Sequence, residues 1–301
     1  MNYRITDQTS SNDLISRINS QRSRLSVLQE RITTGKRINR PSDDPEGAEV
    51  VLRLRTSQTE ITQFQRNAGA ASQKLTSTDT ELSAYENMLD RARTLVTNGL
   101  SGTATQDAKN ALATELDSIR SRLLTIANTK NDDGFVFGGT RQDVPPYDPV
   151  TAAPAATVAS PQFIQVEPGA NAIAVGVTAE SIFGDATSTV FADLTNAVAA
   201  LRGTGDPAAD QATLQNTNTR LGVYSGLSNN AHAVIGANMN AVDITLETLT
   251  NNYQSLDQRA TDLEQINFAE TAIQLADSQN ALDASLQVAA KGRRSLFDFL
   301  G

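Results

Sequence analysis

Both ends of this chain carry apolar residues at the heptad spacing of coiled-coil helices. A helix whose apolar residues return at steps of four and three presents a narrow seam, which is buried most simply against a second seamed helix. The pattern therefore predicts that the two ends lie side by side as helices, with everything between them inserted into a long helical hairpin. The seam residues are Leu14, Ile18, Leu25, Leu28 and Ile32 at one end, and Leu275, Leu282 and Leu286 at the other.

Two long helices are predicted in the first third of the chain. We expect the first to cover residues 13–34 and to end at Gly35. Asn12 or Asp13 is its predicted N-cap. The second should cover residues 45–98, a rod of about 80 Å at the rise of an α-helix. Its apolar residues lie seven apart without a break, at Leu54, Ile61, Ala68, Leu75, Leu82, Leu89 and Val96.

A third helix is predicted to fold back on the second. Thr103 and Gln106 have the spacing of a capping box, which places the helix start after Thr103. One apolar stripe then runs along the segment and predicts the face that packs on the rod. Its members are Leu112, Leu116, Ile119, Leu123 and Ile126.

Beyond residue 130 the apolar period changes from helical to extended. Residues 134–139, bounded by glycines, are expected to form a short strand. Residues 162–166 and 173–177 flank a Pro-Gly turn and should pair as a β-hairpin. These features predict a small β-rich domain over residues 141–190.

The chain returns to helical periodicity after this insertion. Helices are expected at 189–202 and 211–221, followed by a long helix over 227–290. Within the last helix the four-three rhythm changes phase near Ile266, which suggests a domain boundary inside one helix.

Composition excludes several classes of protein. The chain is 39% hydrophobic and only 5% aromatic, which is typical of long helices with solvated outer faces rather than of a compact globule. It has no cysteine, which excludes disulfides and thiolate sites. There is no apolar run near eighteen residues, and the first twenty residues are polar. We therefore expect neither a membrane span nor a cleavable secretory signal.

Charge is distributed unevenly along the chain. The net charge of −9 argues against nucleic acid as the main partner. Residues 1–40 hold eight basic and three acidic groups, whereas residues 241–301 hold four basic and nine acidic groups. Because the two ends carry opposite signs, the charges are expected to favour pairing of the ends, although exposed ion pairs contribute only about 0 to 1 kcal/mol each.

The candidate chemical groups favour structural roles. His232 is the only histidine, which excludes multi-histidine sites, and we expect it to be an exposed helix residue. The acidic pairs Asp43–Asp44 and Asp132–Asp133 adjoin helix ends or turns, where carboxylates are structural. We therefore expect that the chain is not an enzyme and that it needs no metal or cofactor.

Three stretches together resemble bacterial flagellin-family proteins. They are residues 28–39 with 42–48, which contain Thr-Gly-Lys-Arg-Ile and Ser-Asp-Asp-Pro, residues 134–140 with the sequence Gly-Phe-Val-Phe-Gly-Gly-Thr, and residues 267–301. Within that family the chain is most similar to the junction proteins that lie between hook and filament. This similarity depends on the strand that enters one small domain and on the return through Ile182, Phe183 and Gly184.

The resemblance implies a mainly α fold built in layers. The expected fold is a long antiparallel coiled-coil rod formed by both chain ends, with a small inserted β-rich outer domain. The layers expected along the chain are an inner coiled-coil layer at 1–40 and 266–301, a helical rod domain at 41–140 and 191–265, and the outer domain at 141–190.

The resemblance also implies a structural role in the bacterial flagellum. The implied function is to join hook and filament and to transmit torque for swimming. The implied partners are a ring of like subunits, the other hook–filament junction protein, filament flagellin, and the type III export apparatus with an export chaperone; neither nucleic acid nor a membrane is expected as a partner. The implied location is outside the cell, in the flagellum between hook and filament.

The terminal seams are the predicted subunit-assembly interface. A two-helix pair of this kind exposes much apolar surface, and isolated helices of this length are marginal in water. We therefore expect both ends to be largely disordered in the free subunit and to fold when packed between neighbours. The predicted contact residues are the seam residues named above together with Leu296, Phe297 and Phe299.

Two other readings share part of these features. A short filament flagellin would have the same terminal motifs but would polymerise without limit. A coiled-coil adaptor or adhesin unrelated to flagella is the alternative if the terminal resemblance is accidental.

Overall fold

The computed structural model describes residues 3–157, 159–169 and 172–300, with side chains described between residues 12 and 290. The described chain is mainly helical with three short antiparallel strand pairs, which confirms the predicted fold class. The chain divides into two compact units. The terminal unit runs up to Glu60 and resumes at Asn252, and the central unit is Ile61–Asn251.

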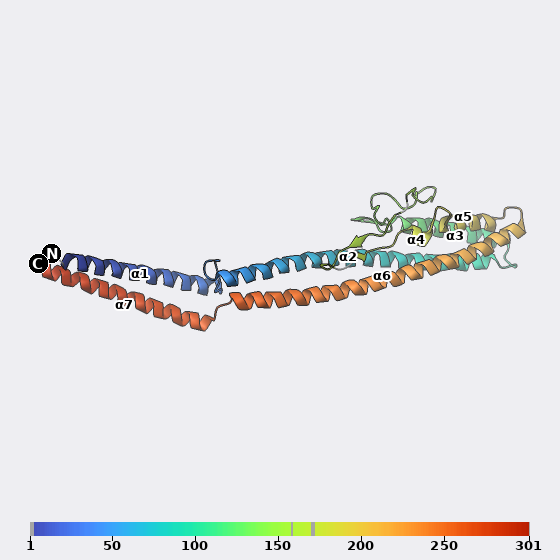
Figure 1. Cartoon of the computed structure of the whole chain (residues 1–301). Helices are drawn as coiled ribbons and strands as arrows, with labels where there is room; N and C mark the ends of the chain where they lie inside the picture. Colours follow the sequence, from blue (N-terminus) through green and yellow to red (C-terminus); the bar gives the residue numbers. More distant parts are fainter. Residues whose placement is uncertain (1–2, 158, 170–171, 301) are drawn as a thin grey trace. The chain divides into compact units, whose positions relative to one another are not determined.

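In the terminal unit, α1 (Tyr3–Thr34) and α7 (Phe268–Leu300) lie side by side as an antiparallel pair (Figure 1). Helix α1 begins about ten residues before its predicted start, so the predicted cap at Asn12 or Asp13 is wrong. The segment before Asn12 contains no proline or glycine, and extending a helix that has already formed costs little. Gly35 ends α1 at a φ of +70°, as predicted.

The central unit contains most of α2 (Pro45–Gly99) and α6 (Pro207–Glu264), together with α3 (Gln106–Ala127), α4 (Glu180–Phe183) and α5 (Val190–Arg202). The bounds of α2 and α5 match the prediction closely. The predicted gap between 211–221 and 227 does not exist, because α6 is continuous there. Its glycines Gly222 and Gly226 are tolerated because Leu221, Tyr224 and Ser228 beside them are buried.

The buried face of α2 follows the predicted heptad within the central unit. Leu75, Leu82, Leu89 and Val96 are at most 2% exposed, and the predicted stripe of α3 packs into the same core. Helix α3 is capped by Thr105, whose side chain accepts from the Ala108 amide at 3.3 Å. The predicted capping box at Thr103 is therefore wrong.

The other half of that predicted box has a tertiary role. The Gln106 amide donates to the carbonyls of Leu201 and Arg202 at the end of α5, at 2.9 and 3.2 Å. The Gln106 side chain therefore ties α3 to the end of α5, and it also donates to Asn110 of α3 at 3.2 Å.

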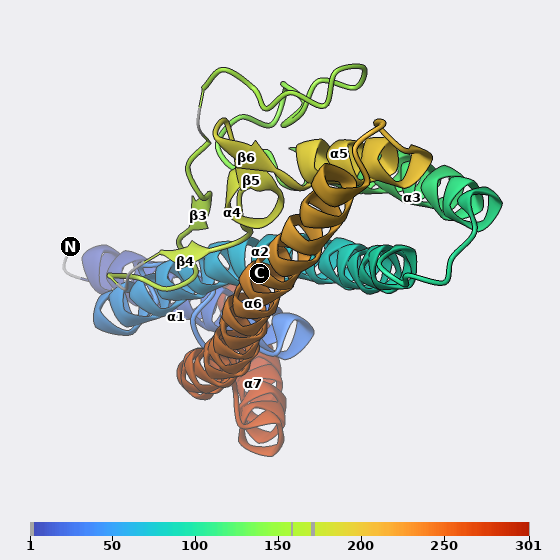
Figure 2. The same cartoon turned by 90° about the vertical axis from the view of Figure 1, so that its right-hand side faces the viewer.

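The inserted region of residues 128–189 lies with α3, α4 and α5 on one side of α2 (Figures 1 and 2). Its centre is a cluster of aromatic rings, with Phe183 in contact with Tyr85 of α2 at a centroid distance of 4.5 Å. Phe137, Tyr147 and Phe191 complete the cluster. The region is therefore held to α2 mainly by packed rings rather than by a large sheet.

The strands of this region are shorter than predicted. The segment predicted as a strand at 134–139 is extended only at Gly134–Phe135 and then turns. The predicted hairpin around the Pro-Gly turn is confirmed, although each strand has two residues. The pairs are β1 (Lys130–Asn131) with β2 (Gly134–Phe135), β3 (Phe163–Ile164) with β4 (Ile173–Ala174), and β5 (Gly184–Asp185) with β6 (Ser188–Thr189).

The predicted helix at 227–290 is two helices. Helix α6 ends at Glu264 and α7 begins at Phe268, so the chain breaks at the position of the predicted phase change. A change of phase moves the apolar seam to another side of the helix, and a break lets each half present its seam to its own neighbours. None of the described helices is both long and apolar enough to cross a membrane.

Candidate assembly interface

The terminal helical pair carries the seam residues predicted from the sequence. Leu28 is buried at 6% exposure, and Leu14, Ile18, Leu25 and Ile32 are half-buried along the same side of α1. These five residues line the side of α1 that faces α7, in contrast to Ile15, which is 53% exposed. The seam of the first helix is therefore brought against the other end of the chain, and much of it remains accessible.

The seam of α7 differs from the predicted one. Its most buried positions are the polar residues Thr271 and Ser278, at 8% and 6% exposure, with Leu275 and Leu282 half-buried between and beyond them. Leu286 is 38% exposed and lies outside the seam, because the four-three rhythm that includes Ser278 and Leu282 continues through Ser285. Leu296, Phe297 and Phe299 lie in α7 beyond the described side chains.

A groove of about 900 Å³ runs between α1 and α7. Its floor includes Leu28 and Ser278, and its rims carry Arg24 and Arg31 on one side and Asp277 on the other. The Ser278 hydroxyl and the Arg31 Nε are buried without a hydrogen-bond partner. Buried polar groups are normally paired, so these two atoms of the groove lack the partners that such groups usually have.

The charge pairing predicted between the two ends is not found as an α1–α7 contact. No ion pair among the described side chains joins these two helices. The ion pairs of the N-terminal region involve other segments. Arg40 pairs with Glu30 at 3.3 Å, and Lys36 pairs with Glu264 at 2.8 Å. The predicted attraction therefore acts between the segment after α1 and the end of α6.

The two chain breaks of the terminal unit are bonded to each other. Lys36 and Gln265 form an antiparallel β-bridge, and the Ile266 amide donates to the Gly35 carbonyl at 3.2 Å. The buried Glu264 carboxylate accepts both Lys36 and Arg55, at 2.8 and 3.3 Å. We call this arrangement the joint, comprising residues 35–37, Arg55 and 264–266.

The pKa of Glu264 reflects its place in the joint. Burial by itself would raise the pKa, but hydrogen bonds and charge from Lys36 and Arg55 outweigh it and hold the pKa below its usual value. Sequence reasoning did not find this role. Two features of the sequence could have indicated it. Glu264 lies directly before the phase change near Ile266, and the basic residues Lys36 and Arg37 directly follow Gly35, the glycine that ends the first helix.

The first acidic pair, Asp43–Asp44, has the structural role that the sequence suggested. Asp43 accepts from the amides of Asn39 and Arg40 at 3.1 and 2.9 Å, and these bonds lower its pKa. Asp44 accepts from the Gly47 amide at 2.9 Å at the start of α2. Among the described residues, no group of three or more His, Cys, Asp or Glu side chains is placed to hold a metal ion.

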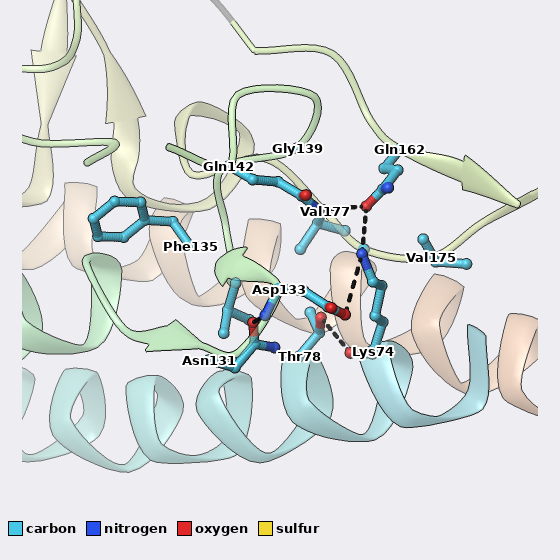
Figure 3. Close-up of a pocket in the computed structure, with 12 residues that line it drawn as sticks. Lys74, Thr78, Asn131, Asp133, Phe135, Gly139, Gln142, Gln162, Val175 and Val177 are labelled. Carbon is cyan, nitrogen blue, oxygen red and sulfur yellow. Dashed lines mark hydrogen bonds and ion pairs between the residues drawn. The ribbon is translucent and has the colours of Figure 1, made fainter. Parts of the chain in front are cut away.

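The enclosed pocket of the central unit is a structural anchor. Figure 3 shows Lys74 of α2 reaching toward Gln162 and Asp133, and its Nζ lies 3.0 and 3.5 Å from their side-chain oxygens. The cavity beside it holds about 30 Å³, roughly the volume of one water molecule. Lys74 therefore fastens two surface loops to α2, and the cavity is too small for an organic substrate.

His232 is not the exposed residue that the sequence suggested. Its ring on α6 is 37% exposed, with Nε2 at 2.9 Å from Asp79 and Nδ1 at 3.3 Å from Glu86. Both carboxylates belong to α2, and Ser228 also donates to Glu86 at 3.0 Å. The histidine therefore links α2 and α6 of the central unit through polar contacts.

Residues 5–140 match the model of the bacterial flagellin N-terminal helical region. The curated flagellar hook-associated protein 3 of Escherichia coli is 27% identical over 279 residues, which cover 85% of this chain and 86% of that protein. The first part of the chain therefore resembles the flagellin N-terminal region, and most of its length is similar to hook-associated protein 3. At this coverage the similarity to hook-associated protein 3 must include most of the central unit.

Two further comparisons concern filament flagellin and the fold. Flagellin of Escherichia coli is 32% identical, but the match covers only 39% of this chain and 23% of that protein. The crystal structure of the flagellar junction protein FlgL from Legionella pneumophila shares the fold, with a TM-score of 0.57, 14% identity, and coverage of 72% of this chain and all of that one. The filament-flagellin alternative is therefore the weaker one.

Proposed function

We propose that this chain is a structural subunit of the bacterial flagellum that joins the hook to the filament and transmits torque between them. The observation that carries the proposal is the extended match to hook-associated protein 3, which includes the central unit, whereas the flagellin match covers about two fifths of the chain. The absence of a ligand-sized enclosed site around Lys74 agrees with a structural role. Torque transmission is the mechanical consequence of joining two rotating parts.

The terminal pair is the proposed contact between neighbouring subunits. Its seam is only half-buried, Ser278 and Arg31 carry unpartnered buried atoms, and Ile273 and Val288 are more than 60% exposed on α7. Such a surface has too little burial to hold two long helices in place by itself. We propose that the two ends order fully when they pack between copies in a ring, so that part of the folding occurs on assembly.

The layered division is proposed for the assembled state. The ends at 1–40 and 266–301 would form the inner layer, the rod at 41–140 and 191–265 the middle layer, and the insertion at 141–190 the outer domain. The packed core of the central unit supports a rigid role for the rod, because cores with fully buried large side chains deform little.

The proposed partners follow from the family resemblance. They are like subunits, the other hook–filament junction protein on one side and filament flagellin on the other. The proposed route out of the cell is the flagellar type III export apparatus, assisted by an export chaperone that acts on the C-terminal region. The proposed final location is the flagellum, between hook and filament.

An assembly assay separates this proposal from filament flagellin. Purified monomer is incubated under flagellin-style seeding conditions and also with isolated hooks that bear the other junction protein, and both samples are imaged by negative-stain electron microscopy. We expect a short cap on the hooks and no growth without them. Long filaments would reassign the chain to flagellin, and inertness in both samples would favour a non-flagellar adaptor.

A variant with two leucines of α7 replaced tests the terminal pair as the assembly contact. Replacing Leu282 and Leu286 with aspartate should block addition to hooks, because charges would enter an interface that buries apolar side chains. The control is Phe163→Asp, at a side chain of the central unit that is 59% exposed. Normal swimming of a strain whose only copy carries both leucine replacements would contradict the proposal.

A further inference from the structure

Helix α6 carries an apolar stripe on its outward side within the central unit. The stripe occupies positions of a single four-three repeat, and its members are Val223, Leu227, Val234, Ala241 and Ile244. The four large side chains among them are between 38% and 66% exposed. Residues 221–242 contain no Asp, Glu, Lys or Arg, although 20% of the chain is charged. A long exposed helix face that is apolar and uncharged is typical of a contact with another protein surface.

The helix on which α6 packs does not cover the apolar stripe. Ser228 and His232 of α6 contact Glu86 of α2, at 3.0 and 3.3 Å. Val234 lies two residues beyond His232, which places the two side chains about 200° apart around the helix. The apolar stripe therefore points away from α2. Because its spacing is that of a coiled-coil seam, the partner that fits it is another helix.

Helix α2 carries an uncharged stripe on its own outward side, which we call the neutral stripe. Its members also repeat at steps of four and three, and they are Gly69, Gln73, Thr76, Thr80, Ser83 and Asn87. The hydroxyls of Thr76 and Thr80 donate to carbonyls one turn back in α2, at 2.9 Å each. Polar groups that are already bonded within their own helix lose little when a partner excludes water. The small side chains of this stripe leave hollows for larger ones.

The two stripes lie at the same level of the central unit but on different sides of it. Gln65 bonds to Thr250 at 3.3 Å, and Ser228 bonds to Glu86 at 3.0 Å. Residues 65–86 of α2 therefore run alongside residues 228–250 of α6. Thr80 lies two residues before the fully buried Leu82, so the neutral stripe faces away from the core, as the apolar stripe does. Two outward faces of helices that are packed on each other cannot meet within one chain.

We propose that the apolar stripe of one copy packs into the neutral stripe of a second copy of this chain. The proposal rests on the assembly of like subunits proposed above and assigns a contact to the central unit. Large side chains at four-three spacing fit between small ones of a facing helix, and an apolar face excludes a partner that would bury charge against it. The neutral stripe meets both conditions over a matching length. The exposed side of α3 does not, because it carries Asp107 and Arg122.

The contact has a direction and a limited size. Because the two faces differ, it is head-to-tail, which is the kind of contact that generates rings or helical arrays. One helix against one helix over roughly 30 Å buries less than a stable dimer interface. We therefore expect the contact to form between copies that are already held side by side in an assembly, and the free chain to be monomeric.

Cysteine cross-linking tests which surfaces meet. The chain has no cysteine, so single replacements give unambiguous disulfides. Val234→Cys chains are mixed with chains that carry Thr76→Cys, Thr80→Cys or Asn87→Cys, added to isolated hooks that bear the other junction protein, and oxidised. We expect a disulfide between the two different chains in at least one of these mixtures, identified by the mass of the joined peptides. The matched control, Val234→Cys with Ser121→Cys at an exposed position of α3, should give none.

Three cross-linking results would overturn the proposal. The first is that no mixture joins the two different chains on capped hooks. The second is that Val234→Cys chains join only to each other, which would mean that the apolar stripe meets its own copy. The third is an internal disulfide in the free monomer of a chain with both Val234→Cys and Thr80→Cys, which would place the two stripes together within one chain.

A charge in the apolar stripe provides a second test. Val234→Asp should lower the number of capped hooks by roughly tenfold or more, because the carboxylate would be buried between copies. Unfolding of the free chain should be unchanged, since Val234 is 51% exposed there. Asn229→Asp adds the same charge at an exposed position of α6 outside the stripe and should cap hooks normally.

Equal capping by the Val234→Asp and Asn229→Asp variants would overturn the proposed contact. The native chain separates this failure from failure of the proposed function. If the native chain caps hooks but no mixture cross-links, only the contact between the two stripes is overturned. If the native chain does not cap hooks, the proposed function and this contact are overturned together.

Discussion

The central and terminal units use the same heptad pattern with different results. In the central unit, Leu75, Leu82 and Leu89 are almost completely buried among residues of α3, α5 and α6. In the terminal unit, Leu14, Ile18 and most other seam residues are half-buried against one helix, and the most buried positions of α7 are polar. The comparison teaches that a heptad predicts a contact face but not whether one subunit supplies enough partners to bury it.

The largest expected difference between the units is in amide exchange of the free monomer. Amides around Leu82–Val96 should be protected by about 10⁵-fold or more, because they open only with the central core. Amides of residues 12–34 and 268–290 should exchange almost without protection, because each helix has only one partner. Hydrogen–deuterium exchange with mass spectrometry measures both. Full protection of the amides of residues 12–34 in a monodisperse monomer would contradict the expected difference between the two units.

The aromatic cluster should give the largest single-residue effect on stability. Phe183→Ala removes a fully buried ring that contacts four other rings, and should lower the free energy of unfolding by about 3 to 5 kcal/mol. Urea unfolding followed by circular dichroism provides the measurement. The control Phe163→Ala removes a ring that is 59% exposed and should cost less than about 1 kcal/mol. Equal costs for the two variants would show that the cluster is not the core of the inserted region.

The joint should have an intermediate effect that depends on pH. Glu264→Gln removes the charge that Lys36 and Arg55 contact, and should speed exchange of the Ile266 amide by about tenfold at pH 7, equivalent to about 1.4 kcal/mol. Because the pKa of Glu264 is lowered in the folded state, its contribution is present above the ordinary value near 4.3 and is lost as pH falls through the folded pKa.

The difference between the Glu264→Gln variant and the native chain should therefore disappear in acid. Glu60→Gln, at an exposed residue of α2, is the matched control and should leave Ile266 exchange unchanged. If Ile266 exchange still differs between Glu264→Gln and the native chain below the folded pKa of Glu264, the replacement disturbs the joint by its shape rather than by the loss of charge.

The smallest effect is expected at His232. His232→Ala removes the contacts with Asp79 and Glu86, and should lower the free energy of unfolding by about 0.5 to 1 kcal/mol, because the ring is over a third exposed. Asn230→Ala, at an exposed position of the same helix, should have no measurable effect. A loss above about 2 kcal/mol would place His232 among the main contacts between α2 and α6.

Local sequence signals predicted the helices well where the residues that start or end a helix agreed with the spacing of the apolar residues. Gly35, Pro45 and the heptad of α2 gave helix bounds within one residue of those observed. The signals failed where a residue had a competing tertiary partner. Gln106 looked like a capping residue but bonds to the end of α5, and the glycines near 222 looked like a break but lie in a helix held by buried neighbours.

The candidate interface was predicted only as a set of positions. The sequence placed Leu14 through Ile32 on one side of a helix, and the structure brings that side against α7. It placed Leu286 in the α7 seam, where the structure has Ser285, because both phases keep the four-three spacing and only the facing helix decides between them. Charge counting predicted attraction between the ends but not that Lys36 and Arg55 would meet at Glu264.

The sequence by itself determined a mainly helical protein with seams at both ends, an inserted region after residue 130, and a break near Ile266, because period and chain-breaking residues act locally. The tertiary structure decided which partner each polar group took. It joined the two chain breaks at Glu264 and placed His232 between two carboxylates. Those contacts join residues that are far apart in the sequence and depend on how neighbouring helices are aligned along their axes. The local spacing of residues carries no information about that alignment.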